Sequence, residues 1–133
     1  MSIPNATQTA ENLLTDYAEV LNTANTAAIA SFYTFDGLFM PDGYQSIKAI
    51  DLARTGERYL KKHGFHISFH IQNVSEENGF VFVQANATTK FNAHQGPEAI
   101  QTSSRDFFIL RKDDTVWKIY KYIFNQDDQS VVA

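Results

Sequence analysis

The sequence predicts an α+β domain in which helices come first and long antiparallel strands follow. Apolar residues recur at helical spacing in the first half of the chain. From residue 65 onward, apolar and polar residues alternate instead, and turn-forming residues separate the alternating segments. Helices followed by a run of strands are typical of a curved sheet that carries its helices on one face.

Length and composition predict a single domain over residues 1–133. Of the 133 residues, 44% are hydrophobic and 14% aromatic, which is enough for a substantial core. The formal net charge of −4 gives no basic surface for nucleic acid or an anionic membrane. The absence of cysteine excludes disulfides, thiolate nucleophiles and sulfur-ligated zinc. The start of the chain lacks the charged and apolar regions of a secretory signal, so we expect a cytoplasmic protein. We also expect no cofactor.

Three helices are expected in the first half of the chain. The first covers 7–23, has Thr7 or Thr9 as its candidate N-cap, and has one apolar stripe made of Leu13, Leu14, Tyr17, Val20 and Leu21. A short second helix follows Asn25, which is a good N-cap residue. The third covers 46–62 and is weakened by Gly56.

The segment between the second and third helices is predicted to turn twice. It reads TFDGLFMPDGY and contains two Asp-Gly pairs, which favour tight turns. The residues GLFM between the pairs are predicted to form a short strand. We expect this segment to form the mouth of a pocket, with Tyr33 and Tyr44 on either side of it.

Four strands are predicted in the second half, over 65–74, 80–91, 103–112 and 115–125. In the last strand, strict alternation directs one set of side chains toward the core and the pocket, with the final member at the rim: Trp117, Ile119, Ile123 and Asn125. The other set would face outward and, with Phe107 and Ile109 of the preceding strand, form an apolar patch: Tyr120, Tyr122 and Phe124. Such patches are rare on monomers, so we expect a homodimer through the convex face of the sheet.

The segment HGFHISFH holds three of the four histidines of the chain. On a strand that rises ~3.3 Å per residue, His66 and His70 share a face but stand roughly 13 Å apart. Two imidazoles at that separation do not reach one metal ion, which needs nitrogen ligands at about 2.1 Å. We therefore expect no metal site there, and a polar strand face is favoured over a role of either histidine in a pocket.

Two segments carry a resemblance to a known group of proteins. They are YAEVLNTANTAAIASFYTFDGLFMPDG at 17–43 and SRDFFILRKDDTVWKIYKYIFN at 104–125. Together they resemble the nuclear-transport-factor-2-like superfamily, and within it the SnoaL-like and ketosteroid-isomerase-like group. The resemblance implies a cystatin-like cone: three N-terminal helices packed on a strongly curved, mixed and mostly antiparallel sheet, with a pocket between helices and sheet.

The resemblance also implies roles for individual residues. Tyr17 falls where ketosteroid isomerases place a tyrosine that donates to the substrate oxygen, and Asp106 falls where they place a protonated carboxyl for the same task. Met40 occupies the position of their aspartate base and moves no proton, while Asp36, Asp42, His66 or His70 stay open as replacements. The remaining candidate pocket residues are Tyr33, Tyr44, Phe108, Trp117, Ile119 and Asn125, besides Met40 itself.

Three functions remain open on this reading. The first is a cofactor-independent isomerase, cyclase or dehydratase acting on a small apolar carbonyl compound. The second is a ligand-binding protein with the same pocket and no turnover. The third is an association domain whose main task is oligomerisation. The missing base at Met40 weighs against the first, and the pair Tyr17 and Asp106 weighs against the third.

Overall fold

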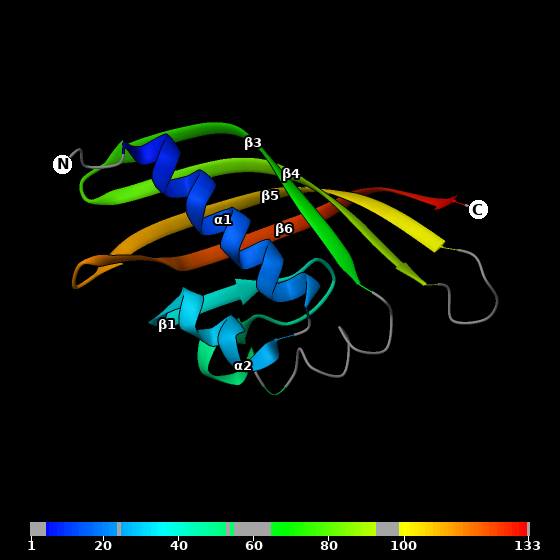
Figure 1. The fold of residues 1–133 in the computed structure, drawn as a ribbon, viewed down its shortest axis with the longest axis horizontal. Helices are drawn as coiled ribbons and strands as arrows, with labels where there is room; N and C mark the ends of the chain where they lie inside the picture. The colour runs from blue at the N-terminus through cyan, green and yellow to red at the C-terminus, as the bar shows by residue number, and fades with distance from the viewer. Residues whose placement is uncertain (1–4, 24, 53, 55–64, 93–98, 133) are drawn as a thin grey trace.

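The computed structural model describes residues 5–23, 25–52, 54, 65–92 and 99–132 (Figure 1). The chain begins with two helices and a 3-10 turn: α1 (Ala6–Asn22), α2 (Thr26–Ile29) and η1 (Ala30–Phe32). Six strands follow: β1 (Tyr33–Met40), β2 (Ile47–Lys48), β3 (His66–Glu77), β4 (Phe80–Asn92), β5 (Ala99–Asp113) and β6 (Val116–Val132). No helix in these ranges is both long and apolar enough to cross a membrane.

The strands form one mixed sheet in the order β2-β1-β6-β5-β4-β3. All neighbours are antiparallel except β1 and β6, which run parallel. Helix α1 lies across one face of this sheet, with β1 on one side of it and β3 on the other (Figure 1). We call the face under α1 the inner face. The α+β class and the mixed sheet expected from the sequence are confirmed.

Helix α1 buries the stripe that its periodicity predicts. Leu14 and Tyr17 are buried against residues of β4, β5 and β6, such as Phe108. Its N-cap is neither threonine considered above, because the Asn5 side chain accepts a hydrogen bond from the backbone N–H of Gln8. An asparagine oxygen satisfies one of the free N–H groups of the first turn in this way.

The expectation of three helices is only partly confirmed. The second helix forms after Asn25, although that side chain makes no capping hydrogen bond. The third does not start at residue 46, because Ile47 and Lys48 form β2 against Leu38 and Phe39 of β1. Residues 49–52 and 54 are helical, and the rest of the expected helix lies outside the described residues.

The first Asp-Gly pair does not form the predicted turn. Asp36 and Gly37 lie inside β1, where the pairing with β6 slips between Tyr33 and Leu38. Such an irregularity bends the strand without ending it. A Cβ on Gly37 would stand 2.9 Å from the Thr34 carbonyl oxygen, so only glycine fits here. The second pair does turn, with Gly43 at a φ of +76°.

A second irregularity exchanges the two faces of β6. Ile109 pairs with Lys121 while Leu110 pairs with Ile119, so Tyr120 is an extra residue in the ladder. One extra residue reverses the direction of the side chains that follow it, as far as the next register shift of this ladder, between Ser103 and Ser104. The strict alternation assumed above is therefore wrong beyond Tyr120. After it, two aromatic side chains face inward and two others outward: Tyr122 and Phe124 inward, Ile123 and Asn125 outward.

Candidate functional site

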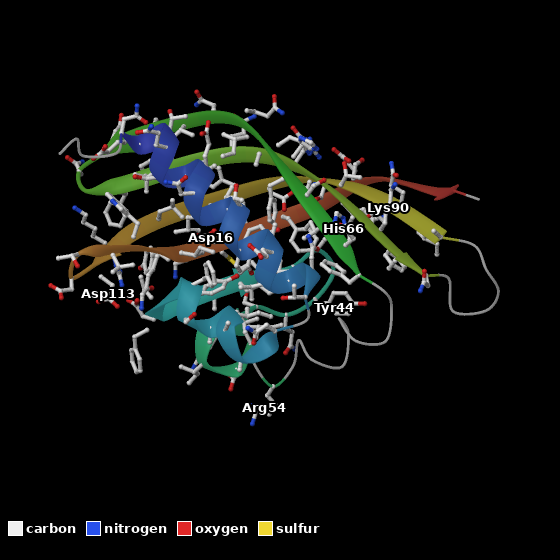
Figure 2. All side chains as sticks on the ribbon, viewed as in Figure 1. Asp16, Tyr44, Arg54, His66, Lys90 and Asp113 are labelled. Carbon is white, nitrogen blue, oxygen red and sulfur yellow. The ribbon has the colours of Figure 1, made fainter. Side chains whose placement is uncertain are left out.

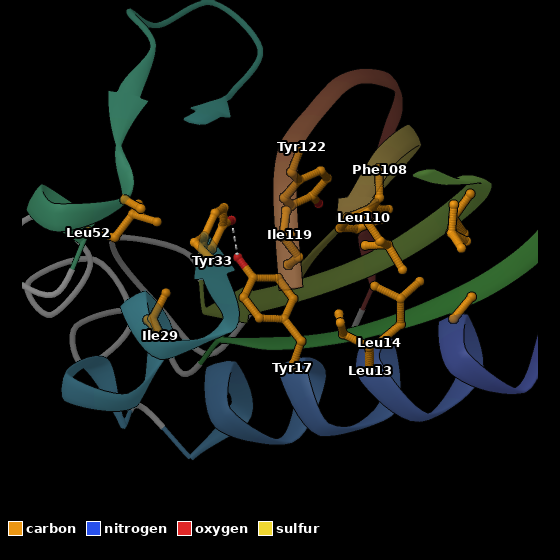
Figure 3. Close-up of a cluster of buried hydrophobic side chains, with 14 residues drawn as sticks. Leu13, Leu14, Tyr17, Ile29, Tyr33, Leu52, Phe108, Leu110, Ile119 and Tyr122 are labelled. Carbon is orange, nitrogen blue, oxygen red and sulfur yellow. Dashed lines mark hydrogen bonds between the residues drawn. The ribbon is translucent and has the colours of Figure 1, made fainter. Parts of the chain in front are cut away.

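Two tyrosine hydroxyls meet beneath α1. Tyr17 extends from α1 toward the sheet, Tyr33 begins β1, and their hydroxyl oxygens are 2.7 Å apart (Figure 3). Only 3% of Tyr17 and 2% of Tyr33 is exposed. The hydrophobic stripe of α1 aims Tyr17 at the sheet, and the turn at η1 brings Tyr33 under it. Either hydroxyl can donate to the other, so one of the two hydroxyl protons lies in this hydrogen bond and the other remains available for donation to a third group.

Asp106 lies on the inner face of β5 and is 2% exposed. One carboxyl oxygen accepts a hydrogen bond from the Ser104 hydroxyl at 2.6 Å. The other accepts one from the Tyr122 hydroxyl. Ser104 and Asp106 share a face because they are two residues apart on one strand, and Tyr122 comes from the neighbouring strand β6.

The two groups belong to one arrangement. The Tyr17 ring meets the Tyr122 ring edge-on, with centroids 6.2 Å apart. Tyr122 thus stands between the tyrosine pair and Asp106, on the same side of the sheet as both. We call these five residues the hydroxyl–carboxyl cluster: Tyr17, Tyr33, Ser104, Asp106 and Tyr122. The structure therefore brings together the two residues that the resemblance singled out.

Burial sets the protonation of the cluster. It raises the pKa of Tyr17 above the ordinary tyrosine value, and those of Tyr33 and Tyr122 well above it, so all three hydroxyls keep their protons. Burial also raises the pKa of Asp106, although the hydrogen bonds from Ser104 and Tyr122 act in the opposite direction. A cluster with neutral hydroxyls and a carboxyl of raised pKa can donate hydrogen bonds to an oxygen that carries partial or full negative charge.

Aromatic side chains surround the cluster. Phe108 stacks on Tyr122 with centroids 4.0 Å apart, and Phe69 approaches both Tyr17 and Tyr122. Phe39 and Phe124 also approach the Tyr122 ring, with centroids 5.2 Å and 5.8 Å away, and are only partly buried. This apolar wall causes the desolvation that raises the pKa of the three tyrosine hydroxyls.

Three further candidate pocket residues lie on the inner side but differ in position. Phe108 and Ile119 are fully buried in the core. Trp117 lies nearer the start of β6, where it lines a hollow of about 360 Å³ together with Leu13 and Phe32. Tyr44 is different, because 81% of its surface is exposed on the turn after β1.

Met40 and Asn125 do not face the cluster. Met40 pairs with Ile123, whose side chain is 47% exposed, whereas its neighbour Phe39 pairs with Tyr122 and faces inward. Asn125 pairs with Arg105, and both are exposed. Strict alternation placed Asn125 at the pocket rim, and the extra residue at Tyr120 reverses it.

The groups that could replace the missing base are also located. Asp36 is engaged by Arg111 and Thr34, and these hydrogen bonds hold the pKa of its carboxyl below the usual value. Asp42 accepts a hydrogen bond from the backbone N–H of Gln126 at 3.1 Å. His66 and His70 are exposed on the parity of β3 that points away from Ile67 and Phe69 (His66 is labelled in Figure 2). None of these contacts links them to the hydroxyl–carboxyl cluster.

Sequence reasoning missed two members of the cluster. Strict alternation predicts Tyr122 on the outer face, because nothing in the sequence marks an extra residue at Tyr120. Ser104 is absent from the predicted site, although its spacing of two residues from Asp106 places both on one strand face. A short polar side chain at that spacing from a buried carboxyl is a usable signal for a hydrogen-bond partner.

No protein-family model matches the chain, and no curated protein sequence matches it. Solved structures do. A ketosteroid isomerase-like protein from Erwinia carotovora atroseptica superimposes with a TM-score of 0.77 and 21% identity, over 89% of this chain and 93% of that one. The hexachlorocyclohexane dehydrochlorinase LinA-type3 from Novosphingobium barchaimii gives 0.75 and 18%, over 93% and 88%.

A domain of unknown function with a cystatin-like fold, from Nostoc punctiforme, superimposes with a TM-score of 0.74 and 10% identity, over 88% of this chain and 74% of that one. These superpositions establish the fold, and at such low sequence identity they leave the activity open. The order of elements, the mixed sheet and these superpositions agree: the chain has the nuclear-transport-factor-2-like, or cystatin-like, fold.

Proposed function

We propose that the protein binds a small, mostly apolar compound through one oxygen atom, which accepts hydrogen bonds from the hydroxyl–carboxyl cluster. The observation that carries this proposal is the pair of buried hydroxyls of Tyr17 and Tyr33 beside the Tyr122–Asp106 hydrogen bond. Buried polar groups cost free energy unless they are paired. Here three tyrosines, a serine and an aspartate are placed in one aromatic environment, where leucines would pack without that cost.

The proton count of the cluster favours an acceptor oxygen as the ligand group. The hydroxyls of Tyr122 and Ser104 both donate their hydrogen bonds to Asp106. The Tyr17–Tyr33 pair retains one proton beyond the one it shares. A protonated Asp106 would add another. A carbonyl, enolate or phenolate oxygen can accept these protons, and the partly buried rings of Phe39, Phe69 and Phe124 suit a flat apolar body.

Turnover of such a ligand is the second candidate function. Donors that bind an enolate oxygen also stabilise the transition state of isomerase, cyclase or dehydratase reactions. The direction of the Asp106 pKa shift supports this candidate, because burial favours the neutral carboxyl and only the neutral form can act as such a donor. With Met40 at the position of the base, and on the outer side of β1, we expect no ketosteroid isomerisation from the wild type.

Titration with 4-nitrophenol tests the proposal. Its phenolate oxygen mimics an enolate, and its absorption spectrum reports the ionisation state of the bound molecule. Binding should weaken about tenfold or more in Tyr17→Phe, because one charge-assisted hydrogen bond is worth about 1.5–3 kcal/mol. Tyr44→Phe removes an exposed hydroxyl and is the matched control, with unchanged affinity. Equal affinities in all three proteins would contradict the proposal.

Association of two copies is a separate proposal that rests on the outer face. Phe82 and Phe107 stack there with centroids 6.3 Å apart, and Phe107 is 40% exposed. Ile109 and Tyr120 extend the apolar patch toward β6. On that strand Ile123 faces outward, whereas Tyr122 and Phe124, which were expected there, face inward. An apolar outer face of this kind supports a homodimer with two-fold symmetry.

A further inference from the structure

β3 is an edge strand of the sheet. Within the described residues it pairs with β4 alone, so its second edge faces away from the sheet. The sheet order places β1 and β2 at the far side, and α1 runs alongside the free edge of β3 (Figure 1). An edge strand presents backbone N–H and C=O groups that can pair with another extended chain.

One side chain already occupies part of this edge. The Asn22 side-chain oxygen accepts a hydrogen bond from the backbone N–H of Ile67 at 2.7 Å. Its amide nitrogen donates to the carbonyl oxygen of the same residue at 2.9 Å. The amide of Asn22 thus pairs with Ile67 as the peptide group of an adjacent strand would.

The direction of the backbone N–H and C=O groups of Ile67 determines the direction of these groups in the residues that follow on β3. In an antiparallel ladder, alternate residues turn both backbone groups toward the partner strand, and those between turn both away. Ile67 turns away from β4, so Phe69 and Ile71 do the same before the pairing slips between Ile71 and Asn73. Two residues therefore direct two donors and two acceptors along the free edge, next to the end that Asn22 caps.

These backbone groups open into a groove between α1 and β3. Its volume is about 730 Å³, and residues 66–71 form one wall. The opposite wall is the side of α1 that carries Glu11, Leu14, Thr15 and Glu19. Both glutamates are exposed, and the lining residues, all within the described part of the chain, include no lysine or arginine. The groove is therefore acidic.

The spacing of the two glutamates matches an extended chain. Glu11 and Glu19 are eight residues apart on a helix that rises 1.5 Å per residue, which separates them by about 12 Å. Residues i and i+4 of a strand share a face and stand roughly 13 Å apart. Lysines or arginines at i and i+4 would each meet one glutamate.

A second copy of this chain fits the groove less well. The strand that it would offer is β3, which contains no lysine or arginine and ends in Glu76 and Glu77. Pairing of two β3 edges would also bring the acidic sides of two α1 helices toward each other. Like charges facing one another oppose that arrangement.

We propose that the β3 edge binds an extended segment of another protein, with basic residues four positions apart, as an added strand between β3 and α1. Main-chain hydrogen bonds to Phe69 and Ile71 hold the segment, and Glu11 and Glu19 select its basic residues. This inference does not depend on the ligand proposed for the hydroxyl–carboxyl cluster.

The probe is a fluorescein-labelled peptide of sequence Ser-Lys-Val-Thr-Val-Lys-Ser, with glutamate in place of both lysines in the control peptide. Fluorescence anisotropy should show binding of the lysine peptide only. Glu19→Lys should weaken it about tenfold, because it turns an attraction into a repulsion. Asp16→Lys is the matched variant, since it makes the same charge change on the opposite side of α1, where it lines the hollow at Trp117. It should change the affinity less than about twofold.

Amide exchange distinguishes an added strand from loose electrostatic attraction. On peptide binding, exchange at Phe69 and Ile71 should slow, while Ile67 changes little because Asn22 already holds its N–H. N-methylation of the peptide backbone at threonine should abolish that protection. Unchanged exchange at Phe69 and Ile71, equal binding of the glutamate peptide, or self-association through β3 without peptide binding would each overturn the proposal.

Discussion

Tyr122 on β6 donates a hydrogen bond to Asp106 on β5, and the rest of the Tyr122 ring is stacked on Phe108. One side chain therefore joins the polar cluster to the aromatic core. This position exists because Tyr120 is an extra residue in the β5–β6 ladder and turns Tyr122 inward. The hydrogen-bond donors of the site and the packing of the core thus depend on the same irregularity of β6.

The stability of the protein should depend on pH through Asp106. Burial raises the pKa of this carboxyl above its value in the unfolded chain. The native state therefore binds more protons between the two values, so the contribution is present below the unfolded pKa and is lost as pH rises through the folded pKa. The free energy of unfolding of the wild type, relative to Asp106→Asn, should fall with rising pH. Urea titrations at several pH values measure it.

Ser104→Ala should move this pH window upward. The Ser104 hydroxyl donates to Asp106 and lowers the pKa of its carboxyl. Without this hydrogen bond, burial raises that pKa further. The midpoint of the pH-dependent loss of stability should then lie at higher pH than in the wild type. A midpoint that stays in place or falls would show that another group controls the titration.

Removing either hydroxyl of the Tyr17–Tyr33 pair should lower the free energy of unfolding by more than half of what removing both hydroxyls does. Tyr17→Phe or Tyr33→Phe leaves a buried hydroxyl without its 2.7 Å partner, at a cost of about 1–3 kcal/mol. The double variant leaves no such orphan, so its loss should be smaller than the sum of the two single losses. Urea denaturation of the four proteins gives these values, and strictly additive losses would contradict the pairing.

Gly37→Ala should destabilise the protein by about 1–3 kcal/mol, because overpacking forces neighbouring groups apart. The new Cβ would lie 2.9 Å from the Thr34 carbonyl oxygen and 3.1 Å from that of Ile119, both backbone atoms. Phe35→Ala lies nearby in β1 and is the control, because Phe35 is 87% exposed and its loss should cost less than about 0.5 kcal/mol. Thermal denaturation compares the two variants.

Adjacent residues of β6 should respond differently to a new charge. Tyr122→Glu places an unpaired charge in the core and should unfold the protein. Ile123→Glu places the same charge on the outer face, where 47% of the side chain is exposed, and should keep the fold while separating the proposed dimer. Circular dichroism reports the first effect and light scattering the second. A monomeric wild-type mass at micromolar concentration would remove the dimer proposal.

The sequence predicts the larger features well because they depend on summed hydrophobic periodicity. The stripe of α1 and the alternation of β3 predict which sides are buried, and both residues that the resemblance singles out, Tyr17 and Asp106, are buried on the inner side of the sheet. Features that depend on a single residue are missed. An extra residue at Tyr120 is invisible to a period-two pattern, yet it moves Tyr122 inward and Asn125 outward.

The turn predicted at the first Asp-Gly pair does not form, for a related reason. Asp-Gly favours a turn locally, but the partly exposed Asp36 is held by Arg111 from β5, seventy-five residues away. Gly37 meanwhile allows β1 to pass close to the backbone of Ile119. Contacts between distant segments decide the outcome there, and local propensity does not contain them.

A double-mutant cycle on 4-nitrophenol binding tests the hydroxyl–carboxyl cluster most directly. Dissociation constants are measured for the wild type, Tyr17→Phe, Asp106→Asn and the double variant. If both side chains serve one ligand oxygen, each single change weakens binding about tenfold, which is ~1.4 kcal/mol. The double change then costs clearly less or clearly more than the sum, with a coupling of at least about 0.5 kcal/mol. Losses that add within error, or no loss in either single variant, would show that Tyr17 and Asp106 do not hold one oxygen together.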